Sequence, residues 1–441
     1  MNCFDPKALI DFAHYHGFHY DICNPHALVQ DIASAMQRGL CGQSSSLAML
    51  PSYLTPVQTV PTGKTVIALD AGGTNFRAAL VHFDTEGKAI PEQTKRVSMP
   101  GTQGQVTAEE FFDRFAALTA PLLEQCPSVC GIGFCFSYPT RIDKDADGTV
   151  LSFSKEVDAP EVIGKKVGEG LREALIRRGL NVPQRIVLLN DTVATLLSGL
   201  IAMKDSGTGP VIGTILGTGY NTAYPEWSIP KIGFESAQKP YIVVCETGTF
   251  AHRYQGYIDK EFDSTTKNPG AYSLEKACSG AYLGPLFLHI VKTGIKDGVL
   301  RFNKQDEFAS WSTLQTKDLN AFLRDPYTKE GALAGLFAAD ESDARSAFTY
   351  LAALVTERAA LLAAAPIAAA VKRLAVYDPL NPARIAIEGT TYFIYHGMRV
   401  ALDSWLHVML SDEQLHPYSI MPVEQASLFG AAVAALTSGI A

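Results

Sequence analysis

The sequence has no block of Lys or Arg, and its 37 basic residues are outnumbered by 45 acidic ones. The resulting net charge of -8 argues against nucleic acid or an anionic membrane as a partner. The chain also lacks any uninterrupted apolar run of the roughly 18 residues that a bilayer-spanning helix needs. Its N-terminal segment shows no apolar core of the kind found in secretory signals. We therefore expect a cytoplasmic protein with no membrane-spanning segment.

The cysteines and histidines show no convincing metal-ligand spacing. Of eight cysteines, Cys126, Cys130 and Cys135 are the closest set, and their spacing matches no zinc pattern. Cys135 lies in an apolar, strand-like segment, so reduced and mostly buried thiols are expected. Among the ten histidines, the close pair is His14-x-His16 on an expected helix. We interpret the histidines as surface or core residues rather than as ligands.

A complete P-loop is also missing. Residues 61–65 read Pro-Thr-Gly-Lys-Thr, but Gln58 stands where the first glycine of a P-loop belongs. In addition, an apolar strand-like segment follows the Gly-Lys-Thr, whereas a P-loop follows a strand and begins a helix. Phosphate binding by this motif is therefore rejected.

The length and composition indicate a globular protein with more than one core. A chain of 441 residues is long for a single core, so two domains are the default expectation. Its 47% hydrophobic and 19% charged residues are typical of globular proteins.

A glycine turn between two apolar segments is the most informative local feature. Residues 65–69 form a strand-like segment that ends on Asp70, Gly72 and Gly73 follow, and a second segment covers residues 76–83. Glycine tolerates the positive φ of tight turns, which predicts a hairpin. Such a turn exposes backbone N–H groups that suit a phosphate, and Asp70 could hold magnesium directly or through water. A plain hairpin with an acidic turn is the alternative.

The same pattern then starts again. An apolar segment at 211–216 is followed by the turn at 217–219 and by further strand-like segments at 221–224 and 241–245. Two strand–glycine turn–strand units predict an internal structural duplication, with two α/β domains whose glycine turns face a shared cleft. The remaining periodicity predicts helices at 5–16, 25–38, 107–123, 161–178, 191–203, 342–371 and 423–436, a helix starting at 389–390, and strands at 95–99, 129–136, 185–189 and 384–387.

Asn190 and Asp191 stand between an apolar strand and a helix. Asp is a favoured helix N-cap, so a purely structural role for Asp191 is a strong alternative. The two interpretations are compatible, because a carboxylate at a helix N-terminus is held in place and stabilised as an anion.

The motif Asp70-x-Gly72-Gly73-Thr74-Asn75-x-Arg77 resembles the first phosphate loop of the hexokinase family, within the sugar kinase, actin and heat-shock ATPase superfamily. Further matches follow in the family's order and cover most of the chain: Asn190-Asp191-Thr192, Gly217-Thr218-Gly219, Ser273-Leu274-Glu275-Lys276 and Glu388-Gly389-Thr390. The resemblance implies a bacterial-type, single-unit hexokinase with two actin-like (ribonuclease H-like) α/β domains flanking a central cleft.

The resemblance also implies roles for individual residues. Those implied for sugar binding are Ser154, Lys155, Asn190, Asp191, Asn221, Glu246 and Glu275, with Asp191 as the general base. Those implied for nucleotide binding are Asp70, Gly72, Gly73, Thr74, Asn75, Arg77, Gly217, Thr218, Gly219, Gly389 and Thr390, with Mg²⁺ near Asp70. The chain departs from the family at Ser154, where Thr is usual, and at Glu388 and Thr390, where Asp and Ser are usual.

The predicted activity is transfer of the γ-phosphoryl group of ATP to the 6-hydroxyl of glucose or a similar hexose. The predicted small domain covers residues 56–192, with a closing helix at about 424–441 returning to it, and residues 1–55 and 193–423 form the large domain. A monomer or homodimer is expected. Two alternatives remain open: an ATPase of the same fold without a sugar acceptor, and a sugar sensor that has lost catalysis.

Overall fold

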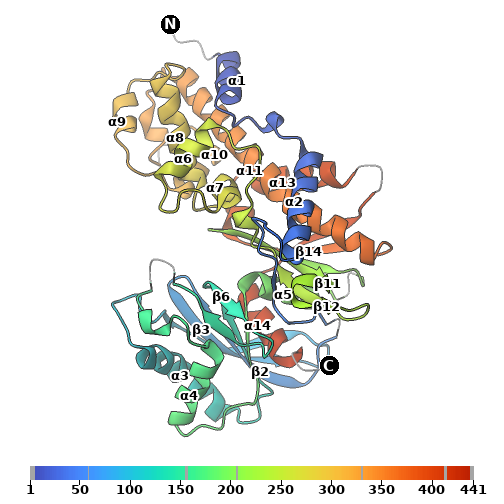
Figure 1. Cartoon of the computed structure of the whole chain (residues 1–441). Coiled ribbons are helices and arrows are strands. Elements are labelled where there is room, and N and C mark those ends of the chain that lie inside the picture. Colours follow the sequence, from blue (N-terminus) through green and yellow to red (C-terminus); the bar gives the residue numbers. More distant parts are fainter. Residues whose placement is uncertain are drawn as a thin grey trace.

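The computed structural model describes residues 5–57, 59–153, 157–204, 207–328, 331–411 and 415–437. Its two main sheets belong to two parts of different size (Figure 1). The smaller part contains β2, β3, α3 and α4, and the larger part carries most of the helices. Helices α5 and α14 lie between them.

The sheet of the smaller part has the order β4-β3-β2-β5-β8. Its strands are β2 (Lys64–Gly72), β3 (Asn75–Phe83), β4 (Ala89–Ser98), β5 (Ile132–Phe136) and β8 (Ile186–Leu189). Alternate residues of β2 enter different cores, because successive side chains of a strand point to opposite faces. Ile67 and Leu69 join the core under α3 (Ala108–Gln125) and α4 (Val167–Arg177), whereas Val66 and Ala68 join the core around α5 (Asp191–Ala202) and α14 (Ala426–Thr437).

The sheet of the larger part has the order β1-β13-β10-β9-β14-β15. Its strands are β1 (Leu50–Pro51), β9 (Val211–Leu216), β10 (Tyr220–Glu226), β13 (Tyr241–Val244), β14 (Ala383–Glu388) and β15 (Tyr418–Pro422). Apart from the short β1, this order repeats that of the other sheet. In both sheets, two antiparallel pairs are followed by two parallel pairs. The predicted duplication is therefore confirmed in the topology.

Helices α5 and α14 connect the two sheets. Helix α14 packs on β2, β5 and β8, helix α5 packs on β9, β10 and β14, and the two helices pack on each other. Two glycines make this stack tight. A Cβ at Gly133 of β5 would lie 1.8 Å from the carbonyl oxygen of Ala431, and one at Gly430 would lie 2.1 Å from that of Ala194. Backbones therefore meet directly at both interfaces, and neither position accepts a side chain without a shift.

Helix α11 (Ser342–Tyr377) is the central helix of the larger part. It is long and apolar enough to cross a membrane by length and composition alone, and 78% of its most apolar window is buried within the fold. It packs against β9, β10 and β14 and against surrounding helices. The other helices of this part are α1 (Pro6–Tyr15), α2 (Pro25–Leu40), α6 (Tyr257–Thr265), α7 (Ser273–Cys278), α8 (Leu283–Lys296), α9 (Gln305–Ala309), α10 (Thr316–Arg324), α12 (Thr390–Ile394) and α13 (Met398–Leu410).

Most predicted elements are present, with shifted ends. The single helix predicted at 161–178 is wrong: a 3₁₀ turn at Pro160–Val162 precedes α4, which starts at Val167. Gly164 separates the two elements with φ +84°, a conformation that an α-helix does not contain. Strand β4 is longer than its predicted 95–99 segment.

Candidate active site

The first glycine turn closes the hairpin of β2 and β3. Gly72 pairs with Asn75, which leaves Gly73 and Thr74 as a two-residue loop, and Gly73 has φ +58°. The phenol of Tyr138 donates a 2.7 Å hydrogen bond to the carbonyl oxygen of Gly73 and fixes the loop from outside. The local prediction of a glycine hairpin is thus confirmed.

Asp70 and Arg77 face each other at the base of this hairpin. The Nε and Nη2 atoms of Arg77 donate to one oxygen of Asp70, Oδ2, at 2.8 and 2.5 Å. The same Nη2 donates to the hydroxyl of Ser427 in α14 at 3.0 Å. Arg77 therefore fixes Asp70 and links the first loop to the C-terminal helix.

Asp191 is the first residue of α5 rather than its cap. The N-cap is Asn190, whose side chain accepts the N–H of Thr192 at 2.8 Å. The interpretation of Asp191 as a capping residue is therefore wrong, and its carboxylate is available for other contacts. Burial raises the pKa of Asp191, hydrogen bonds from Thr192 and Ser137 lower it, and the charge of Asp70 adds to the increase.

Strand register brings Asp70 and Asp191 to the same edge of the sheet. Cys135 of β5 pairs with Asp70 on one side and with Leu189 on the other. With neighbouring strands about 4.8 Å apart, Asp70 and Leu189 are separated by roughly 10 Å at their Cα atoms. Ser137 follows β5 and lies between the two acids, since it hydrogen-bonds Asp191 and its Oγ is 3.1 Å from where a Cβ at Gly72 would be.

Three further side chains approach from the larger part. Glu246 follows β13 with φ +59°, and its Oε1 accepts from the amide of Asn221 at 3.3 Å. Glu275 of α7 accepts the N–H of Tyr220 at 3.0 Å. Burial raises the pKa of Glu246, and the charges of Asp191 and Glu275 raise it further. Glu246 is therefore an electrostatic neighbour of both Asp191 and Glu275, and it connects the acidic side chains of the two parts of the molecule.

The second glycine loop lies against the start of α12. The carbonyl oxygen of Gly217 accepts from the N–H of Gly280 and from the hydroxyl of Thr391, each at 2.8 Å. A Cβ at Gly389, which has φ +125°, would lie 2.2 Å from the carbonyl oxygen of Leu216. A Cβ at Gly219 would lie 2.8 Å from the carboxylate of Glu275. The positive φ and the close backbone at Gly389 require glycine there, whereas a side chain at Gly219 would displace the carboxylate of Glu275.

A cavity of about 490 Å³ opens beside this second loop. Its size is in the range of small-molecule sites. Its lining includes Thr218 of the loop, Thr390 and Thr391 of α12, Gly280, Ala281, and Thr316, Lys317 and Asn320 of α10.

Two residues of the site were not identified from the sequence as part of it. Ser137 hydrogen-bonds Asp191. Its position as the polar residue directly after the apolar strand β5 was the feature of the sequence that could have identified it. Glu388 was noted as a departure from the family but not as a neighbour of the other carboxylates. Burial, together with the charges of Asp191 and Asp70, raises its pKa to about 7, while the N–H of Ala426 and the charge of Arg77 oppose the increase. We call Asp70, Asp191, Glu246, Glu275 and Glu388 the acidic group, because charges within this set raise the pKa values of Asp191, Glu246 and Glu388.

Three other predicted positions are Ser154, Lys155 and Asn75. Ser154 and Lys155 lie outside the described residues. Asn75 donates to the hydroxyl of Thr74 at 3.1 Å and accepts from Nε of Arg96 at 2.8 Å, so it stabilises the loop and β4.

Comparison with known proteins identifies the family. Two family models described as hexokinase match residues 15–201 and 211–437. Hexokinase-5 of Oryza sativa subsp. japonica is 30% identical and aligns with 89% of this chain and 83% of its own. Hexokinase-7 of the same plant is 29% identical over 94% of both chains. The relatives compared are eukaryotic, including a hexokinase of Schistosoma mansoni that is 28% identical over 85% of both chains, so the bacterial-type prediction is not supported.

The solved structures agree. A hexokinase from Schistosoma mansoni complexed with glucose superposes with a TM-score of 0.77 at 25% identity, covering 98% of this chain and 99% of the other. A second hexokinase structure has the same fold, with a TM-score of 0.79 at 24% identity, covering 98% of this chain and 99% of the other. The chain therefore belongs to the hexokinase family, and its activity is the ATP-dependent phosphorylation of a hexose.

Proposed function

We propose that the chain transfers the γ-phosphoryl group of ATP to the 6-hydroxyl of glucose or a similar hexose, with Asp191 as the general base. One observation carries this proposal. Burial and the charge of Asp70 raise the pKa of Asp191, and the charge of Asp191 in turn raises the pKa of Glu246, so Asp191 interacts with carboxylates of both parts of the molecule. A carboxylate that gains affinity for a proton on burial is suited to accept one from a hydroxyl as the oxygen attacks phosphorus.

The acidic group suits a neutral polyol. Ionised carboxylates only accept hydrogen bonds, and sugar hydroxyls supply donors without adding negative charge. Glu246 and Glu275 each have one oxygen engaged by the larger part, through Asn221 and Tyr220, which orients them. We assign Asn190, Asn221, Glu246 and Glu275 to the sugar, together with Ser154 and Lys155 from the family resemblance.

The nucleotide is assigned to the two glycine turns and the cavity beside the second one. Residues 72–75 and 217–219 would surround the phosphates with backbone N–H groups and Thr hydroxyls. The 490 Å³ cavity would hold the adenosine, with Thr390 in its lining and Gly389 directly before it in the chain. The hydroxyl-rich lining from α10 and α12 supports a ribose and base better than a purely apolar ligand.

Asp70 fits a magnesium ion that enters with ATP. Mg²⁺ prefers carboxylate oxygens, phosphate oxygens and water, and it usually takes only one or two protein carboxylates. Arg77 holds Asp70 through Oδ2, so the position of the other oxygen is fixed. When bound, the ion would neutralise phosphate charge and help align the terminal phosphoryl group. Arg77 would keep Asp70 oriented, while Asp191 takes the hydroxyl proton.

Closure of the two parts would complete the site. We propose residues 56–192 with the C-terminal helix as the small domain, and residues 1–55 and 193–423 as the large one. The packing of α14 on β2, β5 and β8 supports the return of the chain to the small domain. Closure on the sugar would exclude water as a competing acceptor. A cytoplasmic monomer or homodimer completes the proposal.

The proposal is tested by measuring ADP release with a panel of hexoses and without any sugar. The expected result is fast turnover with glucose or a close relative and slow hydrolysis in its absence. Sugar-independent ATP hydrolysis at the same rate would favour an ATPase instead. Sugar binding without turnover would favour a sensor.

Glu275→Gln is expected to raise KM for the sugar much more than it lowers kcat, because it weakens an acceptor of sugar hydroxyls.

A further inference from the structure

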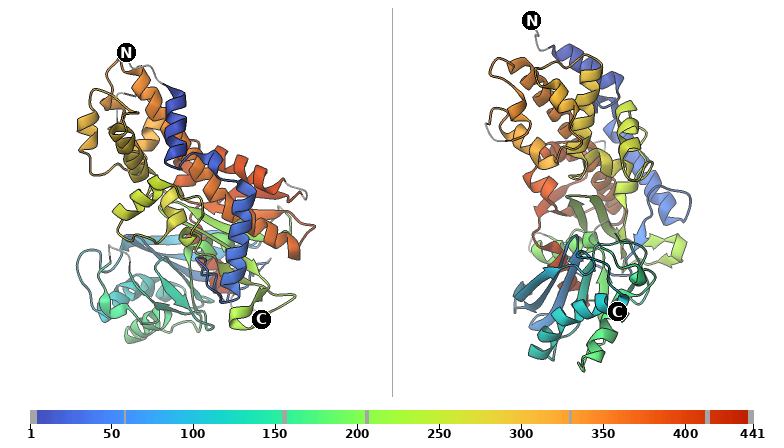
Figure 2. Two further views of the ribbon diagram at one scale, coloured as in Figure 1. Left: turned by 45° about the horizontal axis from the view of Figure 1, so that its top comes forward. Right: turned by 90° about the vertical axis from the view of Figure 1, so that its left-hand side faces the viewer.

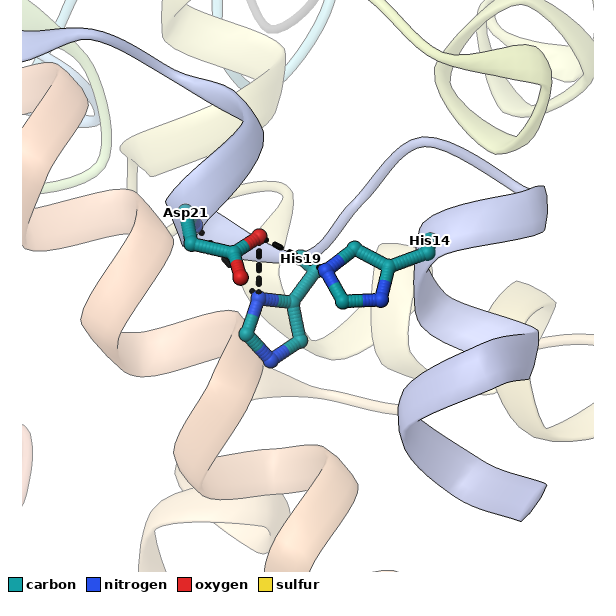
Figure 3. A group of neighbouring side chains, drawn as sticks. All are labelled: His14, His19 and Asp21. Carbon is teal, nitrogen blue, oxygen red and sulfur yellow. Dashed lines mark hydrogen bonds and ion pairs between the residues drawn. The ribbon is translucent and has the colours of Figure 1, made fainter. Parts of the chain in front are cut away.

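We propose that His14, His19 and Asp21 form a binding site for a transition-metal dication, with Zn²⁺ as the best fit. His14 is in the last turn of α1, His19 precedes the 3₁₀ turn at Tyr20–Ile22, and Asp21 is in that turn. Figure 3 shows both imidazole rings turned towards the carboxylate of Asp21. The site is separate from the kinase chemistry and does not depend on the function proposed above.

The ligand atoms already converge. Nε2 of His14 lies 2.8 Å and Nδ1 of His19 lies 2.7 Å from the same oxygen, Oδ1 of Asp21. All three atoms lie within 4.8 Å of one another. Ligands about 2.0–2.1 Å from a tetrahedral zinc ion are separated by roughly 3.3 Å. Each of the two nitrogen–oxygen distances would lengthen by about half an ångström to admit the ion, through movement of the exposed side chains of His14 and Asp21.

The donor set selects the class of metal. Two imidazole nitrogens and one carboxylate oxygen are typical ligands of zinc, and also suit Cu²⁺ or Ni²⁺. Mg²⁺ and Ca²⁺ prefer sites made of oxygen ligands alone. The site is thus distinct in its chemistry from the place proposed for magnesium at Asp70.

The exposure of the three side chains suits an open site. His19 is 8% exposed and stacks on Tyr20, with ring centroids 4.8 Å apart, so one ligand is held in a fixed position. His14 and Asp21 are 39% and 51% exposed, which leaves room for water to complete the coordination. A tetrahedral zinc site with three protein ligands has such an open position.

The location indicates that the metal would stabilise the N-terminal segment. The metal would connect α1 to the 3₁₀ turn, and both elements pack on α11. In the views of Figures 1 and 2, α1 lies at the end of the larger part that is remote from β2 and α4. Metal binding should therefore raise the stability of the protein by mass action without taking part in phosphoryl transfer.

The test uses the full-length protein, stripped of metal, titrated with ZnCl₂ and separately with MgCl₂ by isothermal calorimetry. His14→Gln and Asp21→Asn remove ligands at exposed positions, where the fold should tolerate the change. His407→Gln on α13 and Asp11→Asn on α1 are matched controls, because both residues are exposed and lie outside the cluster. Thermal unfolding with and without zinc gives a readout that needs no turnover.

We expect wild type and both controls to bind one zinc ion that His14→Gln and Asp21→Asn bind at least about tenfold more weakly. Zinc should raise the Tm of wild type and of the controls, and should raise that of the ligand variants less. X-ray absorption should show nitrogen and oxygen ligands, not sulfur. Equal zinc affinity and stoichiometry in all five proteins, or no zinc binding by wild type, would overturn the proposal and leave a hydrogen-bonded cluster only.

Discussion

Replacing Asp191 by Asn removes the proposed base while keeping the shape of the side chain. The amide oxygen can still accept from the hydroxyl of Thr192, which is 3.2 Å from Oδ1 in the native protein. A positioned general base contributes about 10²- to 10⁴-fold in rate, or about 2.7–5.5 kcal/mol of barrier. Burial and the charge of Asp70 raise the pKa of Asp191, which makes it a stronger base than an exposed Asp. We therefore expect kcat to fall by about a thousandfold.

The stability of this variant provides an internal check. An acid with a raised folded pKa stabilises the protein below its unfolded pKa, and this contribution is lost as pH rises through the folded pKa. At neutral pH, which lies above the ordinary pKa of Asp, Asp191 therefore opposes folding, and Asp191→Asn should unfold at the same temperature as wild type or higher. Loss of activity together with a lower Tm would indicate damage to the fold instead.

The assay is coupled ADP release at saturating ATP and hexose, with calorimetry to measure sugar binding by the variant. Asp306→Asn is the matched control, because Asp306 is an exposed carboxylate in the first turn of α9. It should leave kcat and KM unchanged. A kcat for Asp191→Asn within tenfold of wild type, with sugar still bound, would remove Asp191 from the role of base.

Two further predictions concern stability. Glu388→Gln should raise Tm above that of wild type at pH 8, and the difference should disappear below pH 4.5. The reason is that the folded pKa of Glu388 is raised from 4.5 to about 7, so its ionisation across that window opposes folding. Thermal unfolding at several pH values measures this, and a constant difference at all pH values would contradict it. Arg358→Met should cost about 3–5 kcal/mol in urea unfolding, because it leaves Asp259 buried without its 2.5 Å ion-pair partner. Arg253→Met, which breaks the exposed pair with Asp31, should cost much less. Equal losses in the two Arg variants would refute the argument from burial.

Much of the candidate site could be predicted from short stretches of sequence. The turn at Gly72 and Gly73 and the helix start at Asn190 and Asp191 depend on φ preferences and capping, which act over a few residues. The distinction between Asn190 and Asp191 as the cap could not be made this way, because both residue types favour that position. The structure gives the capping role to Asn190, while the carboxylate of Asp191 accepts hydrogen bonds from Thr192 and Ser137.

The acidic group could not be derived from local pattern. Asp70 and Asp191 share an edge because β5 pairs in parallel with both β2 and β8. That register depends on contacts between residues far apart in the sequence. The same pairing places Ser137 against Asp191, and β14 brings Glu388 to this group from the larger sheet. His14 and His16 are the close pair in the sequence and are interpreted from it as surface or core residues, whereas the turn of the chain after α1 brings His14 to His19 and Asp21.

The sequence by itself determined the two strand–glycine turn–strand units, the approximate positions of several helices and the residue types available for phosphate and sugar. These follow from backbone sterics and from hydrophobic periodicity, which are local properties. Only the tertiary structure decided that α5 and α14 fill the space between the sheets, with backbones in contact at Gly133 and Gly430. It also decided which carboxylates become neighbours and so have raised pKa values, because burial and charge proximity exist only once the chain is packed.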